Sequence, residues 1–165
     1  FCTLLPYTAN NMNSSFCIVV LGCTVLPDGS PSDWLTDRLE AAITVVTSIV
    51  SSIRPNSTDP IVINMFLTGG AVKSEITEAS CMRHWLMTRL SSEHSFEVTK
   101  LTDAENCLQH LCVPVKIIFH EEAAAQDTLD NMVFTLRLIF VNEECSKHCF
   151  SSTFDSKIIL ITSDF

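Results

Sequence analysis

The sequence predicts an α/β protein in which a mainly parallel sheet lies between helices, a Rossmann-like three-layer αβα architecture. Continuous apolar runs alternate along the chain with longer segments whose apolar residues recur at helical spacing. Strands that are buried on both faces of a parallel sheet have this unbroken apolar character. Two of the runs end directly in glycine, which suits a tight turn at the end of a strand. Alternating strands and helices favour right-handed crossovers with helices on both faces of the sheet.

The strands are expected from four strong apolar runs and one weaker run. The strong runs comprise residues 16–21, 61–68, 115–120 and 157–164, and the weaker run, a short edge strand, comprises residues 96–99. Residues 1–15 are polar and irregular, so we expect an N-terminal arm there. The remaining residues, 16–165, have the length of a single domain.

Four helices are expected between these strands. The first has Ser30 as its N-cap and Pro31 at the first helical position, and it ends at residues 54–56. The other three comprise residues 74–90, 102–111 and 127–141. One face of the last helix is apolar and contains Leu129, Met132, Val133, Leu136 and Phe140.

The composition argues against several classes of partner. The net charge is −9, and lysine and arginine form no cluster, whereas nucleic acids and anionic membranes attract basic surfaces. No apolar run approaches the roughly 20 residues of a membrane-spanning helix, and no signal peptide is legible. We therefore expect a small-molecule ligand, no nucleic acid and no membrane span within this chain.

Eight cysteines permit two interpretations. Their even number is typical of a disulfide framework. However, Cys17 lies in an apolar strand and Cys81 in a helix, where free cysteine behaves as a small hydrophobic residue. Because a chain of this length can bury a sufficient core without cross-links, reduced thiols are the favoured interpretation.

No motif identifies a cofactor, and no metal site is predicted. Residues 145–149 offer two cysteines and one histidine, whereas a structural zinc site needs four ligands. Cys107 or Cys112 could supply the fourth ligand. The chain contains no G-x-G-x-x-G, no Walker lysine and no G-x-S-x-G motif, so dinucleotide dehydrogenases, P-loop NTPases and serine hydrolases lose support.

Each predicted core strand ends in glycine or polar residues. These residues are Gly22 after the first strand, Thr68, Gly69 and Gly70 at the second, Glu122 after the third, and Ser163 and Asp164 at the fourth. The carboxyl ends of parallel strands meet at one edge of a sheet, where α/β proteins bind ligands. Glycine lets backbone N–H groups approach a ligand closely. We therefore predict a ligand site at this edge.

The candidate side chains each have a structural alternative. Arg38 on the first helix could bind a phosphate or a carboxylate, or form an ion pair with Asp37 or a loop acid. Glu78 could bind a ribose hydroxyl, orient an arginine or act as a base. The structural alternative is that its carboxylate, in the first turn of a helix, interacts favourably with the helix dipole. Glu122 is the stronger acid/base candidate because it follows a strand. Thr128 and Asn131 could contact the ligand, or one of them could cap the helix.

The order of these motifs over residues 16–165 resembles the DUF218 (SanA/YdcF-like) family. The matching segments lie at strand exits and helix starts: Val19-Val20-Leu21-Gly22, Asp28-Gly29, Arg38, Thr68-Gly69-Gly70, Thr77-Glu78-Ala79, Glu122 with Thr128 and Asn131, and residues 160–165. Ala125 stands where the family has serine, and Asp127 stands where it has asparagine. The sequence also ends before the position of the family's histidine.

Two functional hypotheses follow. The resemblance implies an enzyme-like domain of unassigned reaction, and we expect it to act on or with a phosphate-bearing or nucleotide-like molecule held near Gly22 and residues 69–70. Arg38 would bind the anion, while Glu78 and Glu122 would perform acid/base or other polar work. The alternative is a non-catalytic ligand-binding or interaction module, which the departures from the family pattern favour.

Overall fold

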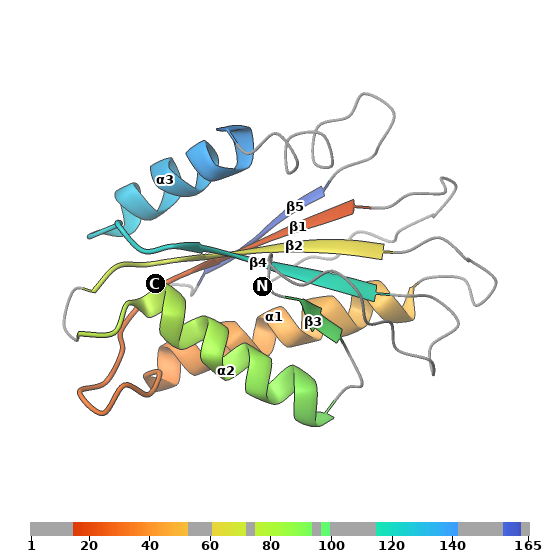
Figure 1. Ribbon diagram of the computed structural model, residues 1–165, viewed down its shortest axis with the longest axis horizontal. Coiled ribbons are helices and arrows are strands. Elements are labelled where there is room, and N and C mark those ends of the chain that lie inside the picture. Colours follow the sequence, from red (N-terminus) through yellow and green to blue (C-terminus); the bar gives the residue numbers. More distant parts are fainter. Residues whose placement is uncertain are drawn as a thin grey trace.

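The computed structural model describes residues 15–52, 61–71, 75–93, 97–99, 115–141 and 157–162. The strands are β1 (Ser15–Leu21), β2 (Ile61–Thr68), β3 (Glu97–Thr99), β4 (Val115–Glu122) and β5 (Lys157–Ile161). They form one five-stranded sheet in the order β3-β4-β2-β1-β5 (Figure 1). Every neighbouring pair of strands is parallel, which confirms the predicted sheet.

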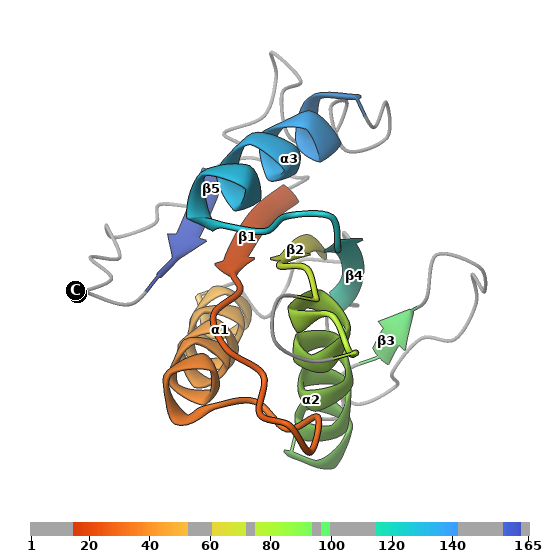
Figure 2. The same cartoon turned by 90° about the vertical axis from the view of Figure 1, so that its left-hand side faces the viewer.

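The helices of the described residues cover both faces of this sheet. α1 (Asp33–Ser51) and α2 (Glu78–Glu93) lie on one face, and α3 (Thr128–Val141) lies on the other (Figure 2). This arrangement confirms the three-layer, Rossmann-like architecture. The chain passes from β1 to β2, then to the edge strand β3 and back to β4 between them, and it finally crosses to β5 on the other side of β1. In folds of this kind, the reversal of strand order marks the crevice in which ligands bind.

The register of the strands aligns their carboxyl ends. Leu21 of β1 lies beside Thr68 of β2, and Thr68 lies beside Glu122 of β4. On the other side of β1, Val20 pairs with Ile161, the last residue of β5. The segments that follow these strands therefore gather at one edge of the sheet, as predicted. We call this region the carboxyl edge and define it as residues 22–24, 68–71, 122–126 and 161–162.

The larger hydrophobic core lies between the sheet and helices α1 and α2. Its fully buried side chains include Ile18, Leu39, Ile63, Met82 and Leu86. A smaller cluster lies on the opposite face, formed by Cys17, Val19, Leu21, Phe66 and Ile139. The apolar layer is thinner on this face because α3 alone covers it in the described part of the chain. Polar side chains of the strands are also buried there, including Asn64, Thr68 and Glu122.

Helix α3 has the reverse of the usual amphipathic orientation. Its buried side chains include Asn131 and Thr135, which are 6% and 3% exposed. The apolar side chains that share one face of the helix are between 45% and 69% exposed, and they are Leu129, Met132, Val133, Leu136 and Phe140. We call these five residues the outer face of α3. An ordinary surface helix would instead bury this apolar face.

Two helix starts differ from the sequence prediction. Ser32, not Ser30, is the N-cap of α1, and its side chain accepts a hydrogen bond from the backbone N–H of Leu35 at 3.4 Å. Ser30 instead donates to Asp28 at 2.6 Å, within a turn that precedes the helix. Helix α2 begins at Glu78 rather than at residue 74, because Thr77 provides its cap by accepting from the N–H of Ser80.

Smaller differences concern the strand ends. β1 includes Ser15, which the sequence assigned to the arm, and β4 continues through Glu122 instead of ending at His120. The rest of the predicted arm, the predicted helix over residues 102–111 and the end of the predicted fourth core strand lie outside the described residues.

The cysteines of the described residues are of two kinds. Cys17 is disulfide-bonded, so the prediction of a reduced thiol is wrong for this residue. Cys23 and Cys81 carry free thiols, as expected. Burial, with a smaller contribution from the carboxylates of Glu78 and Asp28, raises the pKa of the Cys81 thiol.

Among the helices described, none has the length and apolar character needed to cross a membrane.

Candidate functional site

Arg38 is buried on α1 and reaches the exit of β1. Its Nη1 donates hydrogen bonds to the backbone carbonyl oxygens of Leu21 and Gly22, each at 2.7 Å. These bonds fix the direction in which the chain leaves the strand, because one guanidinium nitrogen holds two successive carbonyl groups. Asp37, considered as an ion-pair partner from the sequence, is exposed. Arg38 thus lies at the carboxyl edge, where its Nη1 is bonded within the protein.

Glu78, the first residue of α2, is buried against two glycines. A Cβ atom added to Gly22 would lie 2.3 Å from Glu78 Oε2, and one added to Gly69 would lie 2.4 Å from the same oxygen. Only glycine therefore lets this carboxylate reach the ends of β1 and β2. Because Arg38 also contacts Gly22, opposite charges approach this glycine from α1 and α2. Their proximity reduces the electrostatic cost of burying each charge.

The backbone N–H groups of the three predicted site glycines are bonded within the protein. Gly22 donates to the carbonyl of Thr68 at 2.6 Å, Gly69 to that of Glu122 at 2.9 Å, and Gly70 to that of Ala125 at 2.9 Å. These bonds extend the pairing of the sheet beyond the strands. The glycines thus allow close approach between neighbouring segments of the protein, whereas the sequence suggested close approach to a ligand.

The backbone N–H groups of the first two residues of α2 are also bonded within the protein. Glu78 and Ala79 donate their N–H groups to the carbonyl oxygens of Gly70 and Gly69, at 3.2 and 3.0 Å. The N–H groups at the start of a helix are the ones that commonly bind anions. Here the preceding loop accepts from two of them, so they are not directed towards a ligand.

Glu122, Thr68 and Asn131 form a buried polar cluster beneath α3. Glu122 Oε1 accepts from the N–H groups of Ala124 and Ala125, at 2.7 and 3.2 Å. The Thr68 hydroxyl lies 3.1 Å from Glu122 Oε2 and 2.8 Å from Asn131 Oδ1, both of which can accept from it. The cluster links β2, β4 and α3, and it fixes the loop that follows β4. Glu122 therefore has a structural role in addition to any chemical one.

Thr128 and Asn131, the two residues predicted for the site at the start of α3, lie in different environments. Asn131 joins the buried cluster, and its side chain meets the Thr68 hydroxyl. Thr128 has an exposed side chain at the first position of the helix. The cap is Asp127, whose Oδ1 accepts from the N–H of Asp130 at 2.8 Å. Neither Thr128 nor Asn131 caps the helix, which corrects that alternative.

His120 has a role that was missed in the sequence. It is half-buried on β4, its Nε2 lies 3.1 Å from Asn64 Oδ1, and its ring stacks on Phe66 with 4.5 Å between the centroids. Burial lowers the pKa of His120. His120 therefore lies within the sheet and not at its edge, because β4 is between β2 and β3. The two-residue period of a strand would have placed it on the same face as Glu122.

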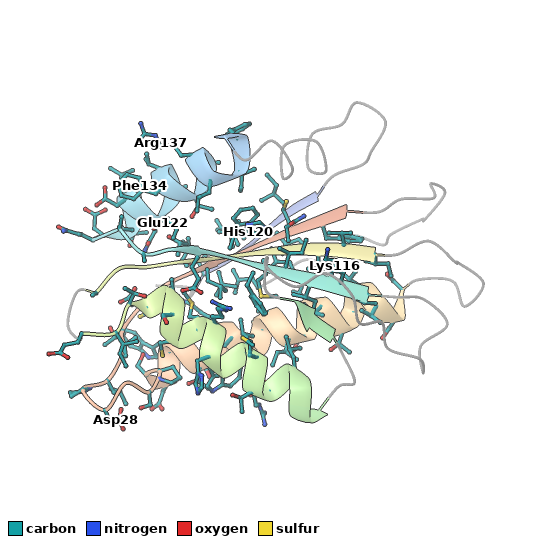
Figure 3. All side chains as sticks on the ribbon, viewed as in Figure 1. Asp28, Lys116, His120, Glu122, Phe134 and Arg137 are labelled. Atoms are coloured by element: carbon teal, nitrogen blue, oxygen red, sulfur yellow. The ribbon has the colours of Figure 1, made fainter. Side chains whose placement is uncertain are left out.

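A shallow hollow of about 520 Å³ lies between the exit of β4 and helix α3. It is lined by Glu121, Glu122, Ala123, Ala124, Phe134, Arg137 and Leu138. Figure 3 shows Glu122 at the end of β4, with Phe134 and Arg137 on the adjacent helix. The hollow thus combines a buried carboxylate, an aromatic ring and a cation. Phe134 and Arg137 were not predicted as site residues from the sequence. Helical spacing alone does not show which side of a helix lies beside the end of a strand.

The carboxyl edge brings together most of the predicted residues. Those that meet there are Gly22, Arg38, Thr68, Gly69, Gly70, Glu78, Glu122 and Asn131. Ser163, Asp164 and residues 145–149 lie outside the described residues. Within the described ranges, no group of three or more histidine, cysteine, aspartate or glutamate side chains could hold a metal ion.

The fold and this edge define the class of the protein, a Rossmann-like α/β domain with a polar strand-exit site. No protein-family model, curated protein or solved structure matches the chain.

Proposed function

We propose that this chain is a DUF218-like domain that binds a phosphate-bearing or nucleotide-like small molecule at the carboxyl edge and acts on it as an enzyme. The observation that carries the proposal is the hollow beside Glu122. Its volume of about 520 Å³ falls within the range of roughly 300–1,000 Å³ typical of small-molecule sites. It also lies outside the carboxyl end of a parallel strand, where proteins of this architecture bind their ligands.

The lining of the hollow suits a ligand with both a ring and an anionic group. Phe134 is half-buried and provides an aromatic surface against which a planar base can pack. Arg137, three residues further along α3, is exposed and provides paired N–H groups for a phosphate. This division assigns anion binding to Arg137, because Arg38 Nη1 is bonded to backbone carbonyls.

In this proposal the acidic residues have different tasks. Glu122 lines the hollow and is the residue that would accept or donate a proton. Glu78 does not line it and lies against Gly22 and Gly69. We therefore assign Glu78 and Arg38 to positioning, since both hold the ends of β1 and β2 from which the carboxyl edge is built.

A non-catalytic ligand-binding module is the second candidate, and the bonding of Glu122 favours it. Both carboxylate oxygens of Glu122 lie within hydrogen-bonding distance of donors of the protein, namely two backbone N–H groups and the Thr68 hydroxyl. A carboxylate held in this way can shape the hollow without taking part in a reaction. The ligand would then bind and leave unchanged.

The two candidates can be separated with Glu122→Gln in a screen of nucleotides and phosphoesters for binding and turnover. The glutamine oxygen can accept from Ala124 and Ala125 as Glu122 Oε1 does, and its amide can donate to the Thr68 hydroxyl. We therefore expect a stability loss below about 1 kcal/mol. If Glu122 is catalytic, turnover should fall by roughly 100-fold or more while binding is retained.

Phe134→Ala tests whether the ligand lies in the hollow. We expect weaker binding of an aromatic ligand, because the ring that would pack on its base is removed. Trp34→Ala is the matched control, since Trp34 is exposed on α1, on the other side of the sheet. Binding without turnover in the wild type would support the module instead. Failure of the wild type to bind any phosphate-bearing ligand would contradict both candidates.

A further inference from the structure

The outer face of α3 is a continuous apolar surface. Its side chains recur at helical spacing, and the two most exposed, Leu129 and Phe140, are 69% and 59% accessible. Single exposed apolar residues are common on proteins, but a contiguous group of this kind is typical of an interaction site. The face runs along α3 from Leu129 to Phe140, so at the helical rise of about 1.5 Å per residue it extends for about 17 Å.

The orientation of α3 is fixed from its opposite side. Asn131 meets the buried Thr68 hydroxyl, while Thr135 and Ile139 are also buried. Rotating the helix to bury its apolar side would expose Ile139 and break the contact of Asn131 with the cluster around Glu122. The outer face therefore stays outward in this fold.

Two opposite charges flank the outer face. Asp130 and Arg137 are seven residues apart on α3, which places them on nearly the same flank, two turns apart. Neither side chain forms an ion pair within the described part of the chain. The midpoint between them lies beside Val133, near the middle of the apolar surface. A two-fold axis beside this midpoint, perpendicular to α3, would generate a second, antiparallel helix. The Asp130 position of each helix would then lie opposite the Arg137 position of the other.

We propose that the outer face of α3 binds a second copy of this chain, with the two helices antiparallel about a two-fold axis near Val133. In such an isologous contact, residue i meets j and j meets i. Asp130 would face the partner's Arg137, and Arg137 would face the partner's Asp130. Val133 and Leu136 would pack near the centre. The net charge of −9 opposes non-specific association, so apolar contact and these two charge pairs must supply the attraction.

The size of the face indicates the strength of the contact. Standard interfaces bury about 800 Å² on each partner, whereas one face of a 14-residue helix provides less. We therefore expect a reversible dimer with a micromolar dissociation constant, detectable by sedimentation equilibrium at protein concentrations up to several hundred micromolar. Leu136→Glu should raise the dissociation constant by at least about tenfold, because it places a charge in the desolvated centre.

Charge reversal provides the sharper test. Asp130→Arg and Arg137→Asp should each weaken the dimer, because each sets like charges against one another across the axis. The double variant Asp130→Arg/Arg137→Asp should restore the dissociation constant to within a few-fold of the wild-type value. Asp37→Arg, an exposed reversal on α1, is the matched control and should leave the mass distribution unchanged. Circular dichroism of each variant checks that α3 still folds.

Two results would overturn the proposal. One is a wild-type protein that remains monomeric throughout this concentration range, which would assign the outer face to a different partner or to none. The other is a dimer that neither Leu136→Glu nor the single reversals weaken, which would assign the contact to another surface. Arg137 also lines the proposed ligand hollow, but the mass measurement is made without ligand and Leu136 does not line the hollow, so the two proposals can fail separately.

Discussion

One methyl group is enough to test how closely the segments approach at the end of β1. A Cβ atom on Gly22 would lie 2.3 Å from Glu78 Oε2 and 2.5 Å from the backbone oxygen of Thr68. We expect Gly22→Ala to lower the free energy of unfolding by about 3 kcal/mol, because the backbone oxygen cannot move without breaking the sheet. Urea denaturation measures this difference.

Gly29→Ala is the comparison for that variant. Gly29 has a φ of +85°, and its nearest neighbour is the flexible Cδ1 end of Ile76. The cost should therefore be conformational and close to 1 kcal/mol. If the two substitutions destabilise the protein equally, the close approach of Glu78 and Thr68 to Gly22 is contradicted.

For single residues, the ends of the predicted strands indicated where a residue lies in the fold better than which other residues it contacts. The apolar run before Gly22 and the one before Glu122 were sufficient to bring both residues to the same edge of the sheet. The bonds that each makes depend on residues far away in the chain: Asn131 is 63 residues from Thr68, whose hydroxyl it meets. No local pattern encodes such a contact, so the internal bonding of Glu122 could not be predicted.

The start of α1 supplies a test at the scale of one element. Ser32 Oγ accepts from the N–H of Leu35, so Ser32→Ala should destabilise the protein by about 1 kcal/mol through the loss of the N-cap. Ser30→Ala should cost less, because it removes only the hydrogen bond of the Ser30 hydroxyl to Asp28, which lies in an exposed turn. A greater loss of stability for Ser30→Ala than for Ser32→Ala would show that Ser30, and not Ser32, caps the helix. Thermal unfolding of the two variants gives the comparison.

Helix α3 shows what amphipathic spacing can and cannot predict for an element. The spacing of Leu129, Val133, Leu136 and Phe140 correctly predicted both a helix and a single apolar face. It gave no information on which face packs against the sheet. In the structure Asn131 decides this, since its side chain meets the Thr68 hydroxyl beside the buried Glu122. A polar cluster on the sheet thus selects the polar side of the helix.

At the scale of the whole molecule, the sheet separates two environments. The face under α1 and α2 is covered by a large apolar core, whereas the face under α3 also buries Asn64, Thr68 and Glu122. The alternation of strands and helices predicted the three layers, because crossover handedness leaves few other arrangements. It did not predict this asymmetry, which arises from which side chains alternate onto each face of β2 and β4.

His120 connects that asymmetry to the stability of the whole protein. Burial lowers its pKa below the value near 6.5 of an unfolded chain. Between the two values the unfolded state binds more protons than the folded state, so the free energy of unfolding should fall as the pH is lowered through 6.5 and below.

His120→Gln can still donate to Asn64 Oδ1 but does not titrate, so it should reduce this pH dependence. His84→Gln, a substitution at an exposed position of α2, is the control variant. Urea denaturation of the three proteins between pH 5 and 8 measures the effect, and equal slopes for the wild type and His120→Gln would show that His120 is not the group responsible.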